Sequence, residues 1–203
     1  MQTPNRIYEN KLKRKGFLNI VGIDEAGRGA WAGPIVAGAI ILPKRLTSKI
    51  KINDSKKLTA KQRQTSYDWL IKNSLSWSVA SVSQETIDKI GIQKSNILAF
   101  KTAVKNLKII PDYILVDAIN FKYKKYQVEP IIKGDQKIVS IAAASIIAKV
   151  YRDNLLKMFH NKHPQYGFDR HKGYGTKKHY DMICKNGICK LHRKSYHPIK
   201  GFM

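Results

Sequence analysis

Apolar residues in the first part of the chain gather in short runs that turn residues and helical segments separate. Residues 18–23, 34–42 and 76–83 each predict a buried strand, and the first of these strands ends in a glycine-rich turn. Residues 58–71 have helical spacing, with Thr59 as a candidate N-cap. Because the connections are short, we expect the three strands to form an antiparallel meander.

The pattern changes in the second half, where helical and strand-like segments alternate. Residues 92–107 predict a helix, residues 113–116 and 128–132 predict short strands, and residues 138–159 form the longest helical stretch. Small residues at 142–144 would let this last helix approach a sheet closely. The alternation predicts an α/β fold with a mixed five-stranded sheet flanked by helices.

The composition becomes rich in Gly, His and Lys beyond Pro164, with one helix expected near residues 176–185. We therefore expect a main domain over residues 1–163 and a small helical C-terminal appendage over residues 164–203. A length of 203 residues with 43% hydrophobic content supports one substantial core.

The charge balance is strongly basic, with 38 Lys and Arg against 14 Asp and Glu and a net charge of +24. A polyanionic partner would relieve the resulting self-repulsion, and nucleic acid is the leading candidate. A general drift towards lysine at positions where any polar residue would serve is an alternative source of part of this excess.

The sequence has no feature of a membrane or secreted protein. No apolar run reaches the roughly 18 residues that span a bilayer, and the basic N-terminus is not followed by the apolar segment of a signal peptide. The cysteines Cys184 and Cys189 do not form a disulfide framework. We expect a cytoplasmic protein, without membrane contact and monomeric.

Acidic residues are scarce, yet two of them, Asp24 and Glu25, stand side by side where a buried strand ends. A buried carboxylate without a partner costs on the order of several kcal/mol, so the pair favours a divalent cation over a solvated face. Asp117 ends the strand at 113–116, and Asp135 follows the strand at 128–132. Either of these alone could be a capping or turn residue, but the four together predict one site.

Oxygen ligands without nearby His or Cys favour Mg²⁺ or Mn²⁺ over zinc. Two such ions about 4 Å apart suit in-line displacement at phosphorus. A second set, His179, Cys184, Cys189 and His192, superficially resembles a zinc site. Its spacing is not that of a common zinc site, so reduced structural cysteines are the better interpretation.

A series of ordered motifs resembles ribonuclease HII, the type 2 ribonuclease H. The resemblance begins at Asp24-Glu25-Ala26-Gly27-Arg28-Gly29 with Gly33-Pro34 and covers nearly the whole chain. Its further blocks are Asp54-Ser55-Lys56-Lys57-Leu58, Val116-Asp117, Lys133-Gly134-Asp135, residues 143–153, Tyr166-Gly167-Phe168, His171-Lys172-Gly173-Tyr174-Gly175-Thr176 and His192-Arg193-Lys194-Ser195.

The resemblance implies a ribonuclease H-like fold and an endoribonuclease. It would hydrolyse the RNA strand of RNA–DNA hybrids and cut 5′ of ribonucleotides embedded in duplex DNA, leaving a 3′-hydroxyl and a 5′-phosphate. It also implies that the metal-binding catalytic carboxylates are Asp24, Glu25, Asp117 and Asp135. Gly27, Arg28 and Gly29 would contact the ribonucleotide and its phosphate, and Tyr174 would stack at the junction and help sense the 2′-hydroxyl.

Departures from the family pattern are few. Ala118 follows Asp117 where the family usually has glycine, Trp31 replaces a usual Leu, and Tyr196 a usual Phe. Arg28 rather than Lys, together with a short N-terminus, argues against the sister type, ribonuclease HIII. None of these changes removes a catalytic group, but Ala118 restricts the turn next to a metal ligand.

Some of these residues have simpler interpretations. Arg28 could be a structural counter-ion for Asp24 or Glu25, and Tyr174 could be an ordinary packed loop aromatic. Lys56 is a plausible phosphate contact, although its motif alone is more often a solvated turn. Asp153, beside Arg152, is interpreted as a structural salt-bridge residue and not as a ligand.

Two rival functions remain at the level of the sequence. A non-catalytic basic RNA-binding protein would explain the charge but would leave four carboxylates without a purpose. Another phosphoryl-transfer enzyme of the same fold, such as a recombination nuclease, would not need a residue that senses the 2′-hydroxyl.

Overall fold

A mixed sheet forms the centre of the computed structural model, which describes residues 3–47, 50–124 and 126–203. Its strand order is β3-β2-β1-β4-β5, with β1, β2 and β3 antiparallel and β4 and β5 parallel to β1. This confirms the predicted meander and the five-stranded α/β sheet. The strand bounds are β1 Ile20–Ala26, β2 Ile35–Ile41, β3 Ser76–Val82, β4 Tyr113–Asp117 and β5 Gln127–Ile131.

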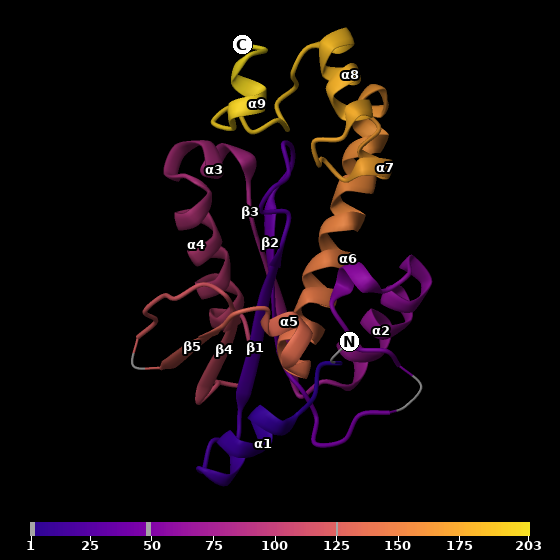
Figure 1. Ribbon diagram of the computed structural model, residues 1–203. Helices are drawn as coiled ribbons and strands as arrows, with labels where there is room; N and C mark the ends of the chain where they lie inside the picture. The colour runs from indigo at the N-terminus through magenta and orange to yellow at the C-terminus, as the bar shows by residue number, and fades with distance from the viewer. Residues whose placement is uncertain (1–2, 48–49, 125) are drawn as a thin grey trace.

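Helices cover both faces of this sheet (Figure 1). One face packs against α4 (Ile92–Lys105), with α3 (Gln84–Ile90) at its upper end, and the other packs against α6 (Val139–Lys162) and α2 (Ala60–Asn73). Helix α1 (Ile7–Arg14) lies at the lower end of the sheet in this view. The short elements are η1 Ser55–Lys57, α5 Gly134–Lys137, η2 Pro164–Tyr166, α7 Phe168–His171, α8 Lys177–Asn186 and α9 His197–Lys200.

Glycines on two strands allow α6 to lie directly against the sheet. A Cβ atom at Gly22 of β1 would fall 2.2 Å from the backbone carbonyl carbon of Ser140. One at Gly38 of β2 would fall 2.5 Å from the carbonyl oxygen of Ala144. The expectation that small residues bring this helix close to the sheet is confirmed, and glycine on the strands is as necessary as alanine on the helix.

Helix α2 begins at the predicted N-cap. The Thr59 hydroxyl accepts a hydrogen bond from the Gln62 amide at 3.2 Å, and the Gln62 side chain accepts one from the Thr59 amide at 3.0 Å. This reciprocal capping box satisfies two amides that would otherwise lack partners.

Helix α1 was not expected, because the basic N-terminal stretch has little apolar periodicity. The helix buries Leu12 and Glu9, and the Glu9 carboxylate accepts a hydrogen bond from the Ser140 amide at 3.0 Å. Glu9 therefore supplies a cap from a distant segment to the N-terminus of α6, where a negative charge is favourable. A contact with a residue so far along the chain leaves no local signal in the sequence.

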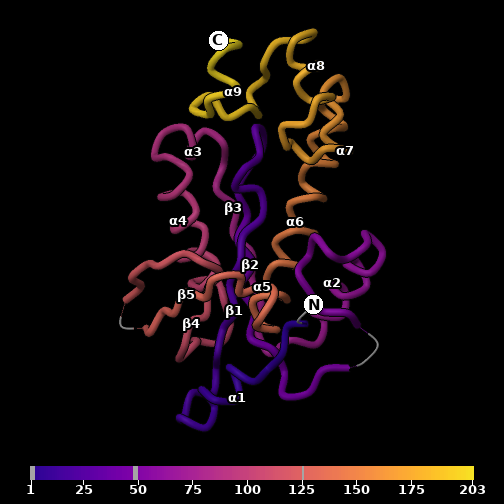
Figure 2. The backbone as a smooth tube through the Cα atoms, viewed as in Figure 1, coloured from indigo at the N-terminus to yellow at the C-terminus, as the bar shows by residue number. Residues whose placement is uncertain are grey.

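The C-terminal segment encloses the loop that joins β1 to β2. The Trp31 amide donates to the Gly173 carbonyl, the Gly33 amide to the Leu191 carbonyl, and the Arg193 amide to the Trp31 carbonyl, each at 2.8 Å. The loop is thus hydrogen-bonded on one side to the segment after α7 and on the other to the segment after α8. The backbone trace in Figure 2 shows the C-terminal segment at the upper end of α6 and the sheet.

Two buried arginines complete this attachment. The Arg193 guanidinium donates to the carbonyls of Gly27, Arg28 and Gly33 at 2.7, 2.9 and 3.0 Å. The Arg152 guanidinium donates to the carbonyls of Pro34, Ala32 and Lys172, at 2.9, 3.1 and 2.9 Å.

Neither arginine forms an ion pair with a carboxylate in the described part of the chain. Asp153 is a salt-bridge residue, as expected, but its partner is Lys149 at 2.8 Å and not the neighbouring Arg152. Burial lowers the pKa of Arg152 to about 10, so the group stays charged at neutral pH. Backbone carbonyls therefore supply most of the compensation for these two buried positive charges, together with the Tyr196 hydroxyl at Arg193 and the rings of Tyr174 and Tyr196.

The histidines of the superficial zinc pattern have a packing role. His179 and His192 are buried, with 3.2 Å between their Nε2 atoms. The His171 ring stacks on the His179 ring, with 4.2 Å between the ring centroids. Cys184 is exposed and Cys189 half-buried, both as free thiols. Within residues 3–47, 50–124 and 126–203, no cluster of His, Cys, Asp and Glu side chains has the arrangement of a ready-made metal site.

No helix among the described residues is both long and apolar enough to cross a membrane.

Replacement of Arg193 should test the importance of the carbonyl contacts for stability. Arg193→Gln is expected to lower the free energy of unfolding by about 3 kcal/mol or more, because it leaves buried carbonyls without a donor. Chemical denaturation measures the change. Arg14→Gln, at an exposed site in α1, is the control and should change stability by less than about 0.5 kcal/mol. Equal effects of the two substitutions would contradict a structural role for the Arg193 guanidinium.

The buried histidines predict a pH dependence of stability. Burial lowers the pKa of His179 to about 3 and that of His192 to about 4. Below about pH 6.5 the unfolded chain therefore binds more protons than the folded one, and the free energy of unfolding falls as the pH drops towards 4. Denaturation at a series of pH values should show this slope, and His179→Gln should reduce it. An unchanged slope in that variant would assign the pH dependence to other groups.

Candidate active site

A cavity of about 420 Å³ opens where β1 and β4 end. Every residue that the sequence predicted for catalysis or substrate binding lines it, although these residues come from distant parts of the chain. They are Asp24, Glu25, Gly27, Arg28, Gly29, Lys56, Asp117, Asp135 and Tyr174.

Strand β1 places the two adjacent carboxylates on opposite faces of the sheet. The strand continues through both residues to Ala26, whereas the sequence predicted that it would end at Ile23. Asp24 shares the face covered by α6 with Gly22, whereas Glu25 shares the α4 face with Ile23. The Asp24 carboxylate accepts a hydrogen bond from the Glu25 amide at 2.7 Å.

Strand β4 brings the third carboxylate beside the first. Ile23 pairs with Val116 in the parallel ladder, so Asp117 is next to Asp24 at the following register position. The Asp117 carboxylate accepts a hydrogen bond from the Gly134 amide at 2.7 Å, which ties β4 to the start of α5. Asp135, the next residue, is buried in the same short helix.

The backbone around this junction is unusual. Ala118, where the family usually has glycine, has a φ of 53°, and Lys133 has a φ of 55°. Non-glycine residues adopt this left-handed region at a cost of about 1 kcal/mol or more. The chain thus accepts strain on both sides of the hydrogen bond that orients Asp117.

All four carboxylates have raised pKa values. Burial is the main cause at each, and Asp24 is further affected by the negative charges of Glu25 and Asp117. At Asp135, burial together with Asp54 and Asp117 raises the pKa to about 6. Like charges held together in a partly dry cavity therefore favour protonation over the ionised state that a cation would need.

These residues fit a hard divalent cation by their chemistry. Every predicted ligand is a carboxylate, and the buried Glu25 Oε2 atom has no hydrogen-bond partner in the described structure. A cation between the carboxylates would remove the repulsion that raises their pKa values. The side chains line the cavity without converging on one point, because Asp24 and Glu25 extend from opposite faces of β1.

The Gly27-Arg28-Gly29 segment forms another wall of the cavity. Gly27 has a φ of 93°, and a Cβ atom there would lie 2.0 Å from Arg152 Nε, so no other residue fits. A Cβ at Gly29 would meet open space. The Arg28 side chain is exposed and makes no ion pair with either carboxylate among the described residues, although its charge lowers the pKa of Glu25. Arg28 is thus not a direct structural counter-ion.

Two cations lie close to the ring of Tyr174, which also lines the cavity. Its ring centre is 5.3 Å from the Arg152 guanidinium carbon and 5.5 Å from Lys149 Nζ. The carbonyl of Tyr174 is 3.0 Å from His179 Nδ1, and its amide donates to the His171 carbonyl at 3.0 Å. The ring is half-buried at the cavity wall.

Lys56 is an exposed residue of η1 at the cavity edge. Asp54, the N-cap of η1, was not among the predicted site residues. The Asp54 carboxylate accepts a hydrogen bond from the Lys56 amide at 3.0 Å and raises the pKa values of Asp117 and Asp135. The charge of Lys56 lowers the pKa values of both carboxylates. The Asp54-Ser55-Lys56 motif was the available signal, but the sequence did not indicate that Asp54 would lie near Asp117 and Asp135.

Asn96 was also missed. It is fully buried in α4, and neither of its amide atoms has a hydrogen-bond partner in the described structure. It lies beside Glu25 on the α4 face and lowers the pKa of that carboxyl. A polar residue within an amphipathic helix gives no sign in the sequence that it faces a functional site.

Comparison with known proteins agrees with this geometry. The family model described as Ribonuclease HII matches residues 21–199. The ribonuclease HII of Chlamydia trachomatis (serovar D) is 46% identical over 195 residues, which are 96% of this chain and 89% of that protein.

Solved structures with similar folds include the ribonuclease H2 of Pyrococcus horikoshii OT3, with a TM-score of 0.77 and 25% identity over 91% of this chain and 97% of that one. Bst-RNase HIII, in a complex with Mn²⁺, has a TM-score of 0.73 at 20% identity over 90% and 68% of the two chains. The fold is therefore ribonuclease H-like. From the matching family model and the close relatives, the chain belongs to the ribonuclease HII family and is a hydrolase of the ribonuclease H type.

Proposed function

We propose that this protein is a metal-dependent endoribonuclease that cuts 5′ of ribonucleotides embedded in duplex DNA and hydrolyses the RNA strand of RNA–DNA hybrids. The products would carry a 3′-hydroxyl and a 5′-phosphate. One observation carries the proposal, namely that carboxylates suited to a divalent cation share a single cavity with the glycine-rich loop and Tyr174.

Asp24, Glu25, Asp117 and Asp135 are the proposed ligands of Mg²⁺ or Mn²⁺. The presence of Mn²⁺ in Bst-RNase HIII, which has the same fold, supports a divalent ion of this kind. When bound, the ions would activate a water molecule and stabilise the charge on the leaving oxygen. The Gly134 amide orients Asp117, and the Glu25 amide orients Asp24, so these ligands are fixed before the substrate arrives.

Selection of ribose is proposed for the Gly27-Arg28-Gly29 loop and Tyr174, which line the same cavity as the carboxylates. The positive φ at Gly27 brings the backbone of the loop to the cavity surface, where it can contact a sugar and its phosphate. Tyr174 would stack on the neighbouring deoxyribose, and Arg28 and Lys56 would contact phosphates; all three residues line the cavity. We propose that the C-terminal appendage, residues 164–203, contributes to substrate recognition through Tyr174, and that residues 1–163 form the catalytic domain.

Substitution of Asp24 should separate metal binding from folding. Asp24→Asn replaces a buried carboxyl group, whose pKa is raised by burial and by neighbouring carboxylates, with a neutral amide. The metal-free variant should therefore unfold at a higher temperature than the metal-free wild type. Mg²⁺ should stabilise the wild type but not the variant. Cleavage of duplex DNA containing one ribonucleotide should fall by about 100-fold or more.

Thermal unfolding with and without Mg²⁺ and a cleavage assay on the same duplex measure these effects. Asp68→Asn, at an exposed site in α2, is a matched control that should leave both unchanged. The absence of metal-dependent cleavage by the wild type would overturn the proposal. Equal cutting of duplexes with and without the ribonucleotide would favour a nuclease without ribose selection.

Tyr174 should determine the preference for a junction. Stacking of an aromatic ring on a nucleotide contributes about 1–3 kcal/mol, so Tyr174→Ala should lower kcat/KM at a single ribonucleotide by about 10- to 100-fold. Tyr174→Phe retains the ring and should retain most of this preference. The measurement compares kcat/KM on a single-ribonucleotide duplex and on a continuous RNA–DNA hybrid. If Tyr174→Ala keeps the wild-type ratio, Tyr174 is not a selectivity residue.

A further inference from the structure

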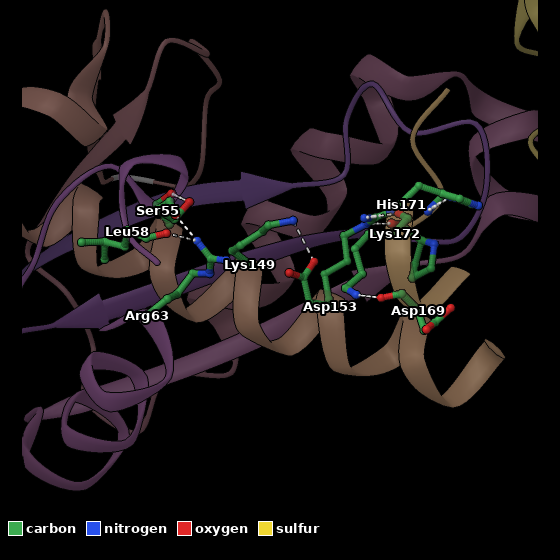
Figure 3. A network of polar contacts seen from close by, with 12 residues as sticks. Ser55, Leu58, Arg63, Lys149, Asp153, Asp169, His171 and Lys172 are labelled. Carbon is green, nitrogen blue, oxygen red and sulfur yellow. Dashed lines mark hydrogen bonds and ion pairs between the residues drawn. The ribbon is translucent and has the colours of Figure 1, made fainter. Parts of the chain in front are cut away.

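A second groove, of about 360 Å³, adjoins the catalytic cavity between α2, α6 and the segment around α7. Lys149 lines both spaces and therefore connects them. Figure 3 shows this region, with Arg63 reaching from α2 on one side and Lys172 lying beyond Asp153 on the other. None of the residues assigned to catalysis or ribose selection lines this groove.

The lining of the groove is strongly cationic. One carboxylate, that of Asp153, lines the groove. The basic residues that line it are Arg63, Lys149, Lys157, Arg170 and Lys172. Lys149 forms the ion pair with Asp153. The Lys157 and Arg170 side chains, in contrast, form no hydrogen bond or ion pair with any described residue.

Two of the cations are held in place by carbonyl groups. The Arg63 guanidinium donates to the carbonyls of Ser55 and Leu58, the latter at 3.0 Å. The Lys172 ammonium donates to the Asp169 carbonyl. Neither is neutralised by these contacts, because the partners are uncharged.

The backbone at Lys172 is constrained as well. Its φ of 54° lies in the left-handed region, and its carbonyl accepts the hydrogen bond from Arg152. Partial burial lowers the pKa of the Lys172 ammonium, with Lys157 and Lys149 adding to this effect and the carboxylates of Asp153 and Asp169 opposing it. A lysine that served only solubility would be expected at an exposed position without backbone strain, and not half-buried beside other positive charges.

The spacing of the cations suits an extended polyanion. Lys149, Asp153 and Lys157 follow one another at intervals of four residues on one side of α6. The rise from Lys149 to Lys157 is about 12 Å, comparable to between three and four base-pair steps of a duplex. The row begins at the catalytic cavity and continues away from it.

We infer that this groove binds the phosphate backbone of the nucleic acid as it leaves the catalytic cavity, with Lys157 and Arg170 as the outer phosphate contacts. The inference rests on the proposed function, because it places the scissile phosphate in the adjoining cavity. The contacts extend the footprint on the duplex without reading its sequence. Asp153 keeps Lys149 directed along the helix towards this path.

The test is the salt dependence of binding, measured without metal so that no cleavage occurs. The variant Lys157→Gln/Arg170→Gln is compared with Lys11→Gln/Arg14→Gln, which removes the same two residue types from exposed sites on α1 at the other end of the molecule. The probe is duplex DNA containing one ribonucleotide. Each lost phosphate contact should reduce the slope of log K against log salt by about 0.9, so the groove variant should lose between about 1 and 2 units and the control much less.

Shortened duplexes locate the contact. Two probes end close to the ribonucleotide, one on its 5′ side and one on its 3′ side. One of them should lack the backbone that the groove contacts, so on that probe the groove variant and the wild type should have the same slope of log K against log salt. Equal slopes for the groove variant and the α1 variant on the long duplex would overturn the inference. So would a defect that persists on both shortened probes, because the groove would then not follow the backbone in one direction.

These outcomes are separate from those for the proposed function. Suppose that the wild type fails to cleave in Mg²⁺ but only the groove variant has a reduced slope of log K against log salt. Phosphate binding by the groove is then supported, and the catalytic proposal is wrong. If the wild type cleaves as proposed and the slopes do not differ, only the groove is rejected.

Discussion

The arrangement of the site depends on two guanidinium groups that are buried against backbone carbonyls. Arg193 holds the carbonyls of Gly27, Arg28 and Gly33, and Arg152 holds those of Ala32, Pro34 and Lys172. The planar, multidentate guanidinium suits this task, whereas a lysine ammonium could not reach carbonyls on different segments in one plane. Through these contacts the loop that follows β1 and the segment that carries Tyr174 are joined into one surface.

A second constraint is electrostatic. The carboxylates destabilise one another, and the basic residues around them compensate only at a distance, since the ionisable groups of Lys56 and Arg28 lower the pKa values of neighbouring carboxyls without forming ion pairs. The site is thus less stable than a neutral one of the same shape would be. Such a cost at a functional site is common when the binding of an ion or substrate repays it.

The strands and the larger helices follow from the sequence because their signals are local. Apolar runs located all strands within a few residues, and Thr59 marked the start of α2. Helix α1 was missed because its stability comes from Leu12 packing and from the Glu9 cap on α6, which a local pattern does not contain.

The candidate site was predicted residue by residue through the family resemblance, and the structure gathers all of those residues in one cavity. Asp54 and Asn96 were not identified, since only the tertiary packing brings them next to the carboxylates. The partner of Asp153 was also beyond the sequence, because neighbouring residues on a helix point in different directions, whereas residues four apart share a face.

The long separation of the arginine contacts has a consequence for how the protein assembles. Gly27 and Arg193 are 166 residues apart in the chain, and Gly33 and Arg193 are 160 apart. Contacts of such high sequence separation form late, since the entropy of closing the intervening loop must first be overcome. During synthesis the sheet can form around β1 and α6 before the last residues emerge. The surface proposed to select ribose would then be completed only when the whole chain has been made, so that an unfinished chain would carry the carboxylates without the means to choose a substrate.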